Sequence, residues 1–417
     1  MKIIIFAYLA GSPSHGMVYG HYYLAREWVR QGHEVTIVSA SFAHTRFKQP
    51  LQSNSIEAEF IDGIRYIWLP TPAYNPASGF GRLRNMVSFS LQCFYRKLPV
   101  HHADLVICSS HQPFPVYAAK RYARKFNARL VFEVRDLWPL TLIELGKLSR
   151  NNPFIAVMQY AEDYAYKHAD YVVSVLPDAK KYMIGRGMHP NKFIFIPNGV
   201  NLSNQHKNID LPMPQKELML HLKASGKFII GYAGRVGLAN ALHILVEALA
   251  LGDDNQVVVA ILGYGAYVNE LKSQAVSLKV DDRVYFLDPV GKDQVHDFLD
   301  MVDVAYIGLQ MKPVFRFGVS PTKLNDFMLA KKPIIYAVEA PGDIVAESGS
   351  GISCSAENPK ALSEAIIRMK NLSQEKRIEM GLKGFEWIKS NRDYKILALQ
   401  FLLAVMNKQA TDQRLKS

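Results

Sequence analysis

Short apolar runs alternate with helical patterns along most of the chain, and this alternation occurs twice. In the first half the runs lie at residues 3–6, 35–39, 105–108, 130–134 and 171–175. In the second half they lie at residues 228–232, 257–262, 284–287, 304–307 and 334–338, separated by helical patterns at 239–250, 266–278, 293–301 and 321–331. Buried strands that alternate with helices are typical of parallel α/β sheets. The pattern therefore predicts two α/β domains, each with a doubly wound parallel sheet, that face a central cleft.

The domain boundaries follow from a change in composition between the two halves. Residues 201–226 are polar and contain two prolines and a glycine, which predicts an interdomain connection with a lead-in helix. We expect an N-terminal Rossmann-like domain at 1–200 and a C-terminal Rossmann-like domain at 227–392. The last 40 residues have a helical pattern throughout, and residues 393–417 are expected to form a helix that packs back on the N-terminal domain.

Cysteine content and hydropathy narrow the class of protein. The 417 residues include three cysteines, Cys93, Cys108 and Cys354, which are far apart and form no Cys-x-x-Cys pair. A disulfide framework and a structural zinc site are therefore not expected, and a reducing compartment is the simplest interpretation. No segment approaches the roughly 20 apolar residues that span a bilayer, and the first apolar run is shorter than a signal-peptide core. We expect a cytoplasmic protein.

The positive charge is concentrated in the first half of the chain. The whole chain carries a formal charge of +12, and residues 1–200 hold 23 Lys and Arg against 13 Asp and Glu. Such an excess indicates an anionic partner, with solubility alone as the alternative. Residues 80–100 combine basic and aromatic side chains that suit an interfacial helix on anionic lipid, although a core helix with charged ends has the same pattern. The candidate membrane contacts are Arg82, Arg84, Phe89, Phe94, Arg96 and Lys97.

The segment Gly-Val-Ser-Pro-Thr-Lys-Leu-Asn-Asp at 318–326 has the clearest chemical signature. Ser320 is predicted as an N-cap and Pro321 as the first helical residue, so that a helix begins at about 321 with a buried stripe of Leu324, Phe327 and Met328. The free N–H groups of the first turn, which includes Thr322, suit a phosphate, and Lys323 adds a cation. Asp326 is suited to accept hydrogen bonds from sugar hydroxyls. An ordinary capped helix is the alternative.

Three further segments follow apolar runs, at the strand ends where parallel sheets bind ligands. Arg235 lies in Gly-Tyr-Ala-Gly-Arg-Val-Gly (231–237), where its guanidinium could hold a diphosphate. Gly263 lies in a Gly-Tyr-Gly turn that could let the backbone approach a nucleotide, and Val290 follows the run at 284–287. A glycine turn with a solvated arginine is the structural alternative.

Two segments of the first half occupy equivalent places. Gly-Ser-Pro-Ser-His-Gly (11–16) contains His15 and Gly16 but lacks the Gly-x-Gly-x-x-Gly spacing, which disfavours dinucleotide binding. Glu-Val-Arg-Asp-Leu-Trp-Pro (133–139) places Arg135 and Asp136 at the end of a predicted strand. Asp136 is predicted to contact a sugar or acceptor with support from Arg135, while a buried ion pair is the alternative. His15 is either a contact to a phosphate or to the acceptor, or a solvated loop histidine.

Taken in order, these segments resemble glycosyltransferase family 4, whose members are retaining enzymes of the GT-B fold. The Gly-Val-Ser-Pro-Thr-Lys and Arg-Asp-Leu-Trp-Pro patterns resemble a bacterial subgroup that makes surface polysaccharides and transfers N-acetylamino sugars. Asp326 matches the second glutamate of the family's Glu-x7-Glu motif, which binds the ribose, whereas the first glutamate falls on Gly318. The family's diphosphate-binding lysine falls on Asn240, and Lys323 is expected to compensate.

The resemblance implies a retaining, metal-independent glycosyltransferase with no cofactor. It would move a sugar from a UDP-sugar to a polyprenyl-diphosphate-linked saccharide in O-antigen or capsule biosynthesis, on the inner face of the cytoplasmic membrane. The N-terminal domain would bind the acceptor through His15, Arg135 and Asp136, and the C-terminal domain would bind the donor. Donor contacts would come from Gly16, Arg235, Gly263, Val290, Ser320, Pro321, Thr322, Lys323 and Asp326.

The predicted catalytic residues are Asp136, Arg235 and Lys323, with Arg235 and Lys323 stabilising the departing diphosphate. No nucleic acid is expected as a partner. The alternatives are a sugar-nucleotide epimerase of the same architecture and a non-catalytic homologue that binds a nucleotide sugar.

Overall fold

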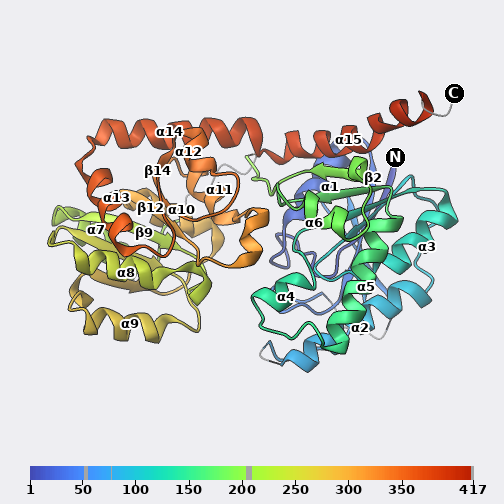
Figure 1. Ribbon diagram of the computed structural model, residues 1–417, viewed down its shortest axis with the longest axis horizontal. Coiled ribbons are helices and arrows are strands. Elements are labelled where there is room, and N and C mark those ends of the chain that lie inside the picture. Colours follow the sequence, from blue (N-terminus) through green and yellow to red (C-terminus); the bar gives the residue numbers. More distant parts are fainter. Residues whose placement is uncertain (51–54, 77, 203–208, 415–417) are drawn as a thin grey trace. The chain divides into compact units, whose positions relative to one another are not determined.

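The computed structural model describes residues 1–50, 55–76, 78–202 and 209–414, with side chains described as far as residue 406. The chain divides into two compact units (Figure 1). Unit 1 comprises Met1–Gly199, Phe317–Ser320 and Tyr394–Ser417, and unit 2 comprises Val200–Arg316 and Pro321–Asp393. The short piece Phe317–Ser320 therefore belongs to unit 1, although the residues on both sides of it belong to unit 2.

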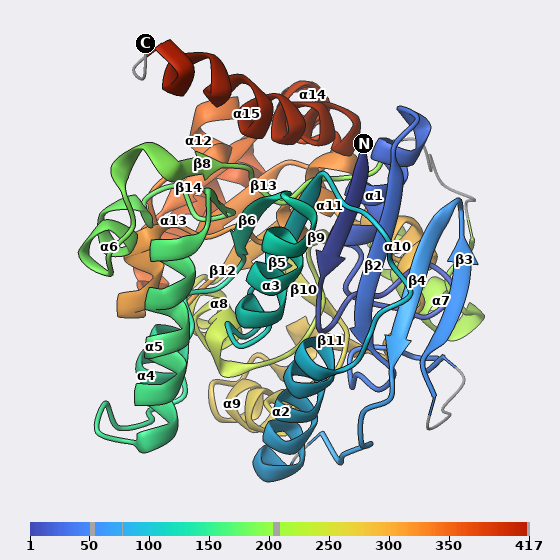
Figure 2. The same ribbon diagram turned by 90° about the vertical axis from the view of Figure 1, so that its right-hand side faces the viewer.

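In the described residues, unit 1 contains an eight-stranded sheet with the order β3-β4-β2-β1-β5-β6-β7-β8. The strands are β1 (Lys2–Phe6), β2 (Glu34–Ala40), β3 (Glu57–Ile61), β4 (Ile64–Leu69), β5 (Leu105–Ser109), β6 (Arg129–Val134), β7 (Tyr171–Ser174) and β8 (Phe193–Phe195). All neighbours are parallel except β3 and β4, which form a hairpin around Asp62 and Gly63. Figure 2 shows β1, β2, β4 and β3 running across unit 1.

Helices cover both faces of this sheet. They are α1 (Gly20–Arg30), α2 (Gly79–Tyr95), α3 (Val116–Phe126), α4 (Leu140–Glu144), α5 (Pro153–His168), α6 (Lys180–Gly185) and α15 (Tyr394–Arg414), with a 3-10 turn η1 (Pro190–Lys192). Alternate residues of β1 pack against the helices on opposite faces of the sheet. Ile3 and Ile5 share a core with α1 and α15, whereas the ring of Phe6 contacts Tyr122 of α3.

Unit 2 contains a fully parallel six-stranded sheet with the order β11-β10-β9-β12-β13-β14 in its described residues. The strands are β9 (Phe228–Ala233), β10 (Val257–Leu262), β11 (Val284–Leu287), β12 (Val304–Gly308), β13 (Ile334–Ala337) and β14 (Gly351–Cys354). Their apolar runs are almost continuous because parallel strands are buried on both faces. The first five match the predicted strands, and β14 adds a short edge strand.

The helices of unit 2 complete a doubly wound arrangement. They are α7 (Met213–Ala224), α8 (Leu242–Leu251), α9 (Val268–Ser277), α10 (Val295–Met301), α11 (Thr322–Leu329), α12 (Ile344–Ser348), α13 (Pro359–Asn371) and α14 (Gln374–Asn391), with 3-10 turns η2 (Leu238–Asn240), η3 (Asp281–Arg283), η4 (Lys292–Gln294) and η5 (Pro313–Phe317). Leu245, Leu271 and Leu362 place α8, α9 and α13 on one core with Ile230. Gly231 faces the opposite way, because a Cβ there would lie 2.6 Å from Val302, which follows α10.

One sequence expectation about secondary structure was wrong, and one pair of strands was not predicted. The last 40 residues are not helical throughout, because α14 ends at Asn391 and α15 begins at Tyr394, where the chain passes from unit 2 to unit 1. The hairpin β3–β4 was also not predicted, since its outer strand alternates charged and apolar residues and lies at the sheet edge. The prediction of two parallel doubly wound sheets is confirmed.

Candidate active site

The turns after β9 and β10 pack against each other through their backbones. A Cβ on Gly263 would lie 1.9 Å from the carbonyl oxygen of Gly234, and one on Gly265 would lie 1.8 Å from that of Val236. Gly234 and Gly263 also have φ values of +140° and +151°. Only glycine fits such close contact and such a backbone. The predicted Gly263 turn therefore packs directly against the backbone of the Arg235 turn, at the carboxyl end of the sheet.

Arg235 lies in a fixed turn but has an exposed side chain. Its carbonyl oxygen accepts hydrogen bonds from the Tyr232 hydroxyl at 2.7 Å and the Asn240 amide at 3.1 Å, which hold the turn. In the part of the chain that the structure describes, no side chain hydrogen bonds or ion-pairs with its guanidinium. The fork of donors is thus available for a ligand.

Lys323 brings a second cation to the same turn. Its Nζ donates to the Tyr232 hydroxyl at 2.8 Å and to Asn240 Oδ1 at 2.7 Å, and it lies 3.7 Å from the position of a Cβ on Gly234. Burial lowers the pKa of Lys323 to about 8. Among the described residues its recorded partners are neutral, so the ammonium is partly desolvated without a recorded carboxylate partner. An anion placed between Lys323 and Arg235 would supply the opposite charge.

The helix that carries Lys323 begins differently from the prediction. α11 starts at Thr322 with Pro321 as its N-cap residue, and no side chain caps it. The prediction of Ser320 as N-cap was wrong, because its hydroxyl instead accepts a hydrogen bond from the backbone N–H of Asn198 at 3.2 Å. The predicted buried stripe is confirmed, with Leu324, Phe327 and Met328 at most 1% exposed.

Asp326 lies on the partly exposed side of α11, where it has a cationic neighbour that the sequence did not indicate. Lys292 of η4 places its Nζ 3.4 Å from Asp326 Oδ1. η4 follows the loop after β11 that contains Val290, which is half-buried. Helix and loop therefore meet at the carboxyl end of the sheet, although Lys292 is 34 positions from Asp326 in the sequence.

Gly318, which replaces the first glutamate of the family motif, has a backbone that excludes a glutamate. Its φ is +94°, and a Cβ would lie 2.4 Å from Cδ of Pro177. Any side chain at position 318 would thus be strained and would collide with the loop after β7. The missing carboxylate reflects a differently built loop rather than a simple exchange of side chains.

In unit 1, Arg135 belongs to a buried charge network at the carboxyl ends of β5 and β6. His21 Nε2 lies 2.8 Å from both Glu133 Oε2 and Ser109 Oγ, and Glu133 Oε1 lies 3.2 Å from Arg135 Nη1. Burial opposes ionisation of Glu133, but His21 and Arg135 outweigh it and hold its pKa well below the usual range. The same surroundings lower the pKa of His111 to about 3, chiefly through burial and then through Arg135.

This network changes the interpretation of the Arg-Asp pair. The Arg135 side chain is 11% exposed, and its other terminal nitrogen donates to Asn198 Oδ1 at 2.5 Å. Direct acceptor binding by Arg135 would require these hydrogen bonds to break. Asp136, the next residue, remains exposed at the end of β6. His21 and Glu133 were not predicted as site residues, since a histidine inside a helix gives no sequence signal of its distant partner.

His15 also differs from its prediction as an acceptor contact. The residue is 4% exposed, with Nδ1 2.9 Å from Ser12 Oγ and Nε2 3.4 Å from Glu59 Oε2 of β3. It therefore ties the loop at 11–16 to the sheet edge and does not project into solvent. Gly16 has φ +110°, and its N–H donates to the Ser12 carbonyl at 2.7 Å, so its role is also in the shape of this loop.

The membrane contact predicted for Phe89 was wrong. Phe89 is completely buried and its ring contacts Tyr8. Phe94 is half-buried, and Arg82 donates to the Pro76 carbonyl at 3.0 Å, whereas the other predicted basic residues of this segment are exposed. The apolar side chains that α2 exposes are different ones, namely Phe80, Val87, Leu91 and Tyr95.

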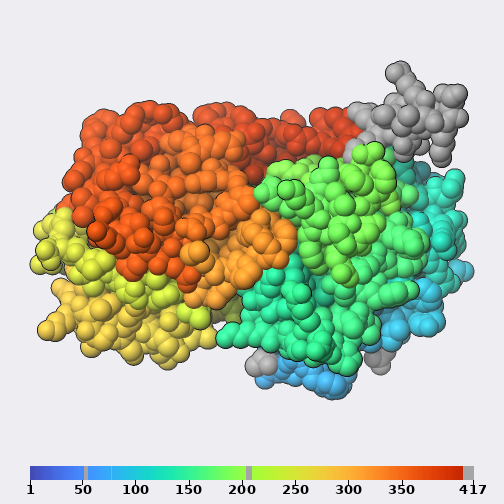
Figure 3. All heavy atoms as spheres, in the orientation of Figure 1, coloured from blue at the N-terminus to red at the C-terminus, as the bar shows by residue number. Residues whose placement is uncertain are grey.

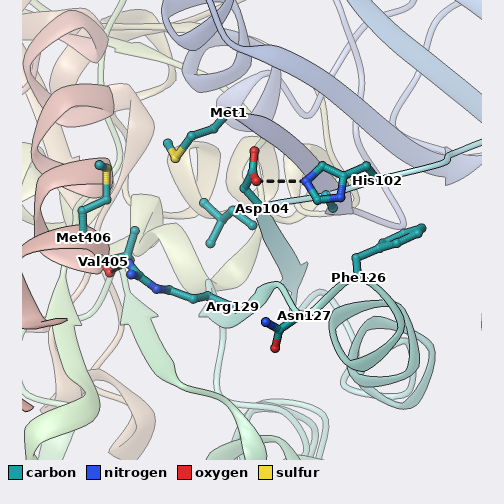
Figure 4. Close-up of a pocket in the computed structure, with 10 residues that line it drawn as sticks. Met1, His102, Asp104, Phe126, Asn127, Arg129, Val405 and Met406 are labelled. Carbon is teal, nitrogen blue, oxygen red and sulfur yellow. Dashed lines mark hydrogen bonds and ion pairs between the residues drawn. The ribbon is translucent and has the colours of Figure 1, made fainter. Parts of the chain in front are cut away.

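A cavity of about 570 Å³ in unit 1 lies at the opposite end of the sheet (Figure 4). Its lining includes Met1, Asp104 and Arg129, which lie at the amino ends of β1, β5 and β6, together with Val405 and Met406 of α15. Parallel sheets bind ligands at their carboxyl ends. The candidate active-site residues therefore lie elsewhere.

The described residues contain neither a cluster suited to a metal ion nor a membrane-spanning helix. No group of three or more His, Cys, Asp or Glu side chains there is arranged to hold a metal ion. Likewise, none of the helices in that part of the chain has the length and hydropathy needed to cross a membrane.

Each half of the chain matches a glycosyltransferase family model. Residues 15–204 match the Glycosyltransferase Family 4 model, and residues 216–387 match the model of Glycosyl transferases group 1. A protein of Pseudomonas aeruginosa named "Probable glycosyltransferase WbjE" is 25% identical over 59% of this chain and 60% of its own length. A protein of Escherichia coli (strain K12) named "Putative colanic acid biosynthesis glycosyl transferase WcaI" is 23% identical over 82% of this chain and 84% of its own length.

Solved structures share the fold. Sucrose-phosphate synthase from Thermosynechococcus elongatus superposes with a TM-score of 0.71 at 15% identity, covering 98% of this chain and 99% of the other. Anabaena Alr3699/HepE, solved with UDP and glucose, gives a TM-score of 0.66 at 17% identity over 98% and 100%. With a family 4 model followed by a group 1 model over most of its length, the chain is a glycosyltransferase of the GT-B fold.

Proposed function

We propose that the protein transfers a sugar, with an N-acetylamino sugar as first choice, from a UDP-sugar to a polyprenyl-diphosphate-linked saccharide in bacterial surface polysaccharide biosynthesis. The observation that carries the proposal is the pair of cations at the end of β9, where Lys323 has only neutral recorded partners beside the exposed Arg235. WcaI is named for colanic acid biosynthesis, and HepE was solved with UDP and glucose, which supports both the pathway class and the donor class.

The two cations suit the chemistry of the leaving group. When the bond between sugar and diphosphate breaks, negative charge develops on the diphosphate oxygen. Lys323 and Arg235 would stabilise that charge from positions fixed beforehand, and such preorganised electrostatic stabilisation is commonly the largest contribution to catalysis. Asp326 would accept hydrogen bonds from the ribose. Attack on the same face of the sugar, assisted by the leaving phosphate, would retain the anomeric configuration without a metal ion or cofactor.

Tyr264 is the residue that we assign to the nucleobase. It stands between Gly263 and Gly265, is 67% exposed, and its carbonyl oxygen accepts the Val236 N–H at 2.7 Å, so that the turn holds it beside the Arg235 turn. An exposed aromatic ring in the turn packed against the Arg235 turn would offer a stacking surface for a base, and such stacking is worth about 1–3 kcal/mol. From the sequence, only the glycines of this turn indicated a ligand.

Transfer and binding assays test the donor site. The wild-type protein should be stabilised against heat by UDP, and should transfer sugar from a UDP-sugar to a lipid-diphosphate acceptor in the presence of EDTA. Lys323→Met should remove most of both effects. Lys360→Met, which changes an exposed lysine of α13, is the matched control and should behave like wild type. Absence of stabilisation by every nucleoside diphosphate would overturn the proposal.

A non-catalytic homologue is the alternative that one observation favours, since the backbone at Gly318 excludes the family's first glutamate. Such a protein would bind UDP-sugar but produce neither transferred product nor free UDP with any acceptor. An epimerase would instead convert the sugar while it remains attached to UDP. Analysis of the products from a single incubation distinguishes these outcomes from sugar transfer.

We further propose that α2 docks unit 1 on an anionic membrane. The four exposed apolar residues of α2 recur at intervals of seven, four and four, which places them along one side of the helix. Exposed Arg84 lies on the same side between Phe80 and Val87, exposed Arg96 and Lys97 follow the helix, and α2 contributes to the blue surface of unit 1 (Figure 3). Exposed apolar side chains next to exposed basic ones suit a lipid interface with negative headgroups. The acceptor would be reached from this surface, on the cytoplasmic face of the membrane.

Vesicle sedimentation tests the membrane surface. Binding to vesicles with phosphatidylglycerol should exceed binding to neutral phosphatidylcholine and should weaken with added salt. Leu91→Glu should abolish it, whereas Leu251→Glu, an equally exposed leucine in unit 2, should not. If Leu91→Glu binds like wild type, α2 is not the membrane contact. If the wild-type protein binds neither kind of vesicle, the positive charge of the first half serves solubility alone.

A further inference from the structure

Asn198 makes three hydrogen bonds that join two of the motifs described above. Its Oδ1 accepts from Arg135 Nη2 at 2.5 Å, and its Nδ2 donates to the carbonyl oxygen of Ser320 at 3.0 Å. Its backbone N–H donates to Ser320 Oγ at 3.2 Å. One amide group therefore lies between the arginine of the Arg-Asp-Leu-Trp-Pro segment and the serine of the Gly-Val-Ser-Pro-Thr-Lys segment.

The orientation of the Asn198 amide is determined from the Arg135 side. Arg135 Nη1 donates to Glu133 Oε1 at 3.2 Å, and Glu133 Oε2 lies 2.8 Å from His21 Nε2. The hydrogen bonds that orient Arg135 therefore begin at buried side chains. Gly20 makes room for it, since a Cβ there would lie 3.0 Å from Arg135 Nη2. Because the guanidinium only donates, Asn198 must present its oxygen to Arg135 and its NH2 group to Ser320.

The Asn198 amide also binds the segment Phe317–Ser320, which other residues of unit 1 contact as well. The carbonyl of Phe317 accepts the Asp178 N–H at 3.1 Å, and the Phe317 ring contacts Tyr182 at 5.5 Å. At the end of this segment Asn198 binds both the carbonyl and the hydroxyl of Ser320. α11 begins two residues later, and its second residue is Lys323.

We propose that Asn198 is a positioning residue for donor binding, and that Arg135 acts through Asn198 on the donor segment instead of binding the acceptor. Holding the Ser320 carbonyl restricts the backbone of the peptide that leads to Thr322, the first residue of α11, and α11 also carries Lys323 and Asp326. This inference rests on the proposed function for its kinetic consequences, but its structural consequence can be measured in the protein without ligand.

Asn198→Ala, Asn198→Asp and Arg135→Ala test this inference. Asp keeps an oxygen for Arg135 but replaces the donor to the Ser320 carbonyl with a second oxygen, so it should be no better than Ala. We expect each variant to bind UDP about 5- to 10-fold more weakly, the effect of losing about one hydrogen bond, and to raise the KM for the donor. The double variant Arg135→Ala/Asn198→Ala should be no worse than either single variant, because both residues act along one path.

Asn152→Ala is the control, because the Asn152 side chain accepts a structural hydrogen bond from the Phe154 N–H at the start of α5. It should lower the melting temperature but leave UDP affinity unchanged. An Arg135→Ala variant that raises only the KM for the acceptor would overturn the inference, as would an Asn198→Ala variant with wild-type UDP affinity.

Hydrogen exchange separates failure of this inference from failure of the proposed function. In the protein without nucleotide, Asn198→Ala should speed amide exchange in α11 but not in α13, whatever the substrate is. Unchanged exchange in α11 would reject the positioning role even if the wild-type protein transfers sugar. Absence of UDP binding by the wild-type protein would instead reject the proposed donor, and the exchange result would still decide the role of Asn198.

Discussion

At the scale of single residues, the main electrostatic feature is a lysine ammonium whose recorded partners are neutral. Tyr232 and Asn240 provide oxygen atoms for Lys323, but neither carries a negative charge. Burial therefore disfavours the charged ammonium of Lys323 and lowers its pKa to about 8. A ligand diphosphate would supply the missing charge and raise this pKa, so ligand binding and protonation of Lys323 should favour each other.

The pH dependence of UDP affinity checks this coupling. Below about pH 8 Lys323 carries its proton in the free protein, and the affinity should be high. As the pH rises through 8 the proton must be taken up on binding, so the affinity should fall by up to tenfold per pH unit. Calorimetry at pH 9 in buffers of different ionisation enthalpy should show proton uptake. A flat profile from pH 7.5 to 9.5, or the same profile in Lys323→Met, would contradict this assignment.

A second residue-scale prediction concerns Gly318. Restoring the family's acid with Gly318→Glu should not improve activity, because the side chain meets Pro177 and requires a left-handed backbone at φ +94°. We expect a loss of at least about 1–3 kcal/mol in the free energy of unfolding, measured by urea denaturation. Gly349→Glu is the comparison. Gly349 also has a positive φ, but a Cβ there would lie 3.6 Å from the flexible side chain of Lys383, so this variant should lose less free energy of unfolding.

At the scale of elements, α5 and α6 meet around one buried carboxyl group. Glu162 is 1% exposed and accepts hydrogen bonds from Tyr166 at 2.8 Å and Tyr182 at 2.9 Å. Burial raises its pKa to about 7 in spite of these hydrogen bonds. The protonated carboxyl is therefore the form that suits the folded protein, and this contact contributes most to stability at low pH.

The predicted consequence is a pH-dependent contribution from Glu162. An unfolded glutamate titrates at about 4.3, so the contribution is complete below that pH and is lost as the pH rises through about 7. Glu162→Gln should remove this dependence, with a gain relative to wild type on the order of 3 kcal/mol between pH 4.5 and 8. Denaturant unfolding across that range measures it, and parallel pH curves for the two proteins would show that Glu162 is ionised when folded.

At the scale of the whole molecule, the chain returns to unit 1 after completing unit 2. α15 buries Leu397, Phe401 and Val405 in the core that contains α1, and the Trp28 indole donates to the Ala398 carbonyl at 2.9 Å. Apart from Phe317–Ser320, the chain between Gly199 and Tyr394 belongs to unit 2. The stability of unit 1 therefore depends on residues that follow unit 2 in the sequence.

Phe401→Ala tests this dependence. Phe401 is 1% exposed and its ring contacts Trp28 at 5.3 Å. Its removal should cost unit 1 about 3–5 kcal/mol. Calorimetry with a saturating nucleotide should then show an earlier transition for unit 1, whereas the transition of unit 2 keeps its position. A single transition that shifts as a whole would mean that the two units unfold together.

The sequence determined the repeated strands and helices, because buried parallel strands need apolar runs and glycine turns need glycine. It also indicated the chemical character of the donor segment through Arg235, Lys323 and Asp326. It could not determine which polar groups meet, since hydrogen bonds such as Arg135–Asn198 and Asn198–Ser320 join residues 63 and 122 positions apart. Only the tertiary structure showed that Ser320 binds Asn198 instead of capping α11, that Phe89 lies in the core, and that the backbone at Gly318 leaves no room for a glutamate. Local composition fixes an element's preference, whereas burial and long-range contacts decide what each side chain does.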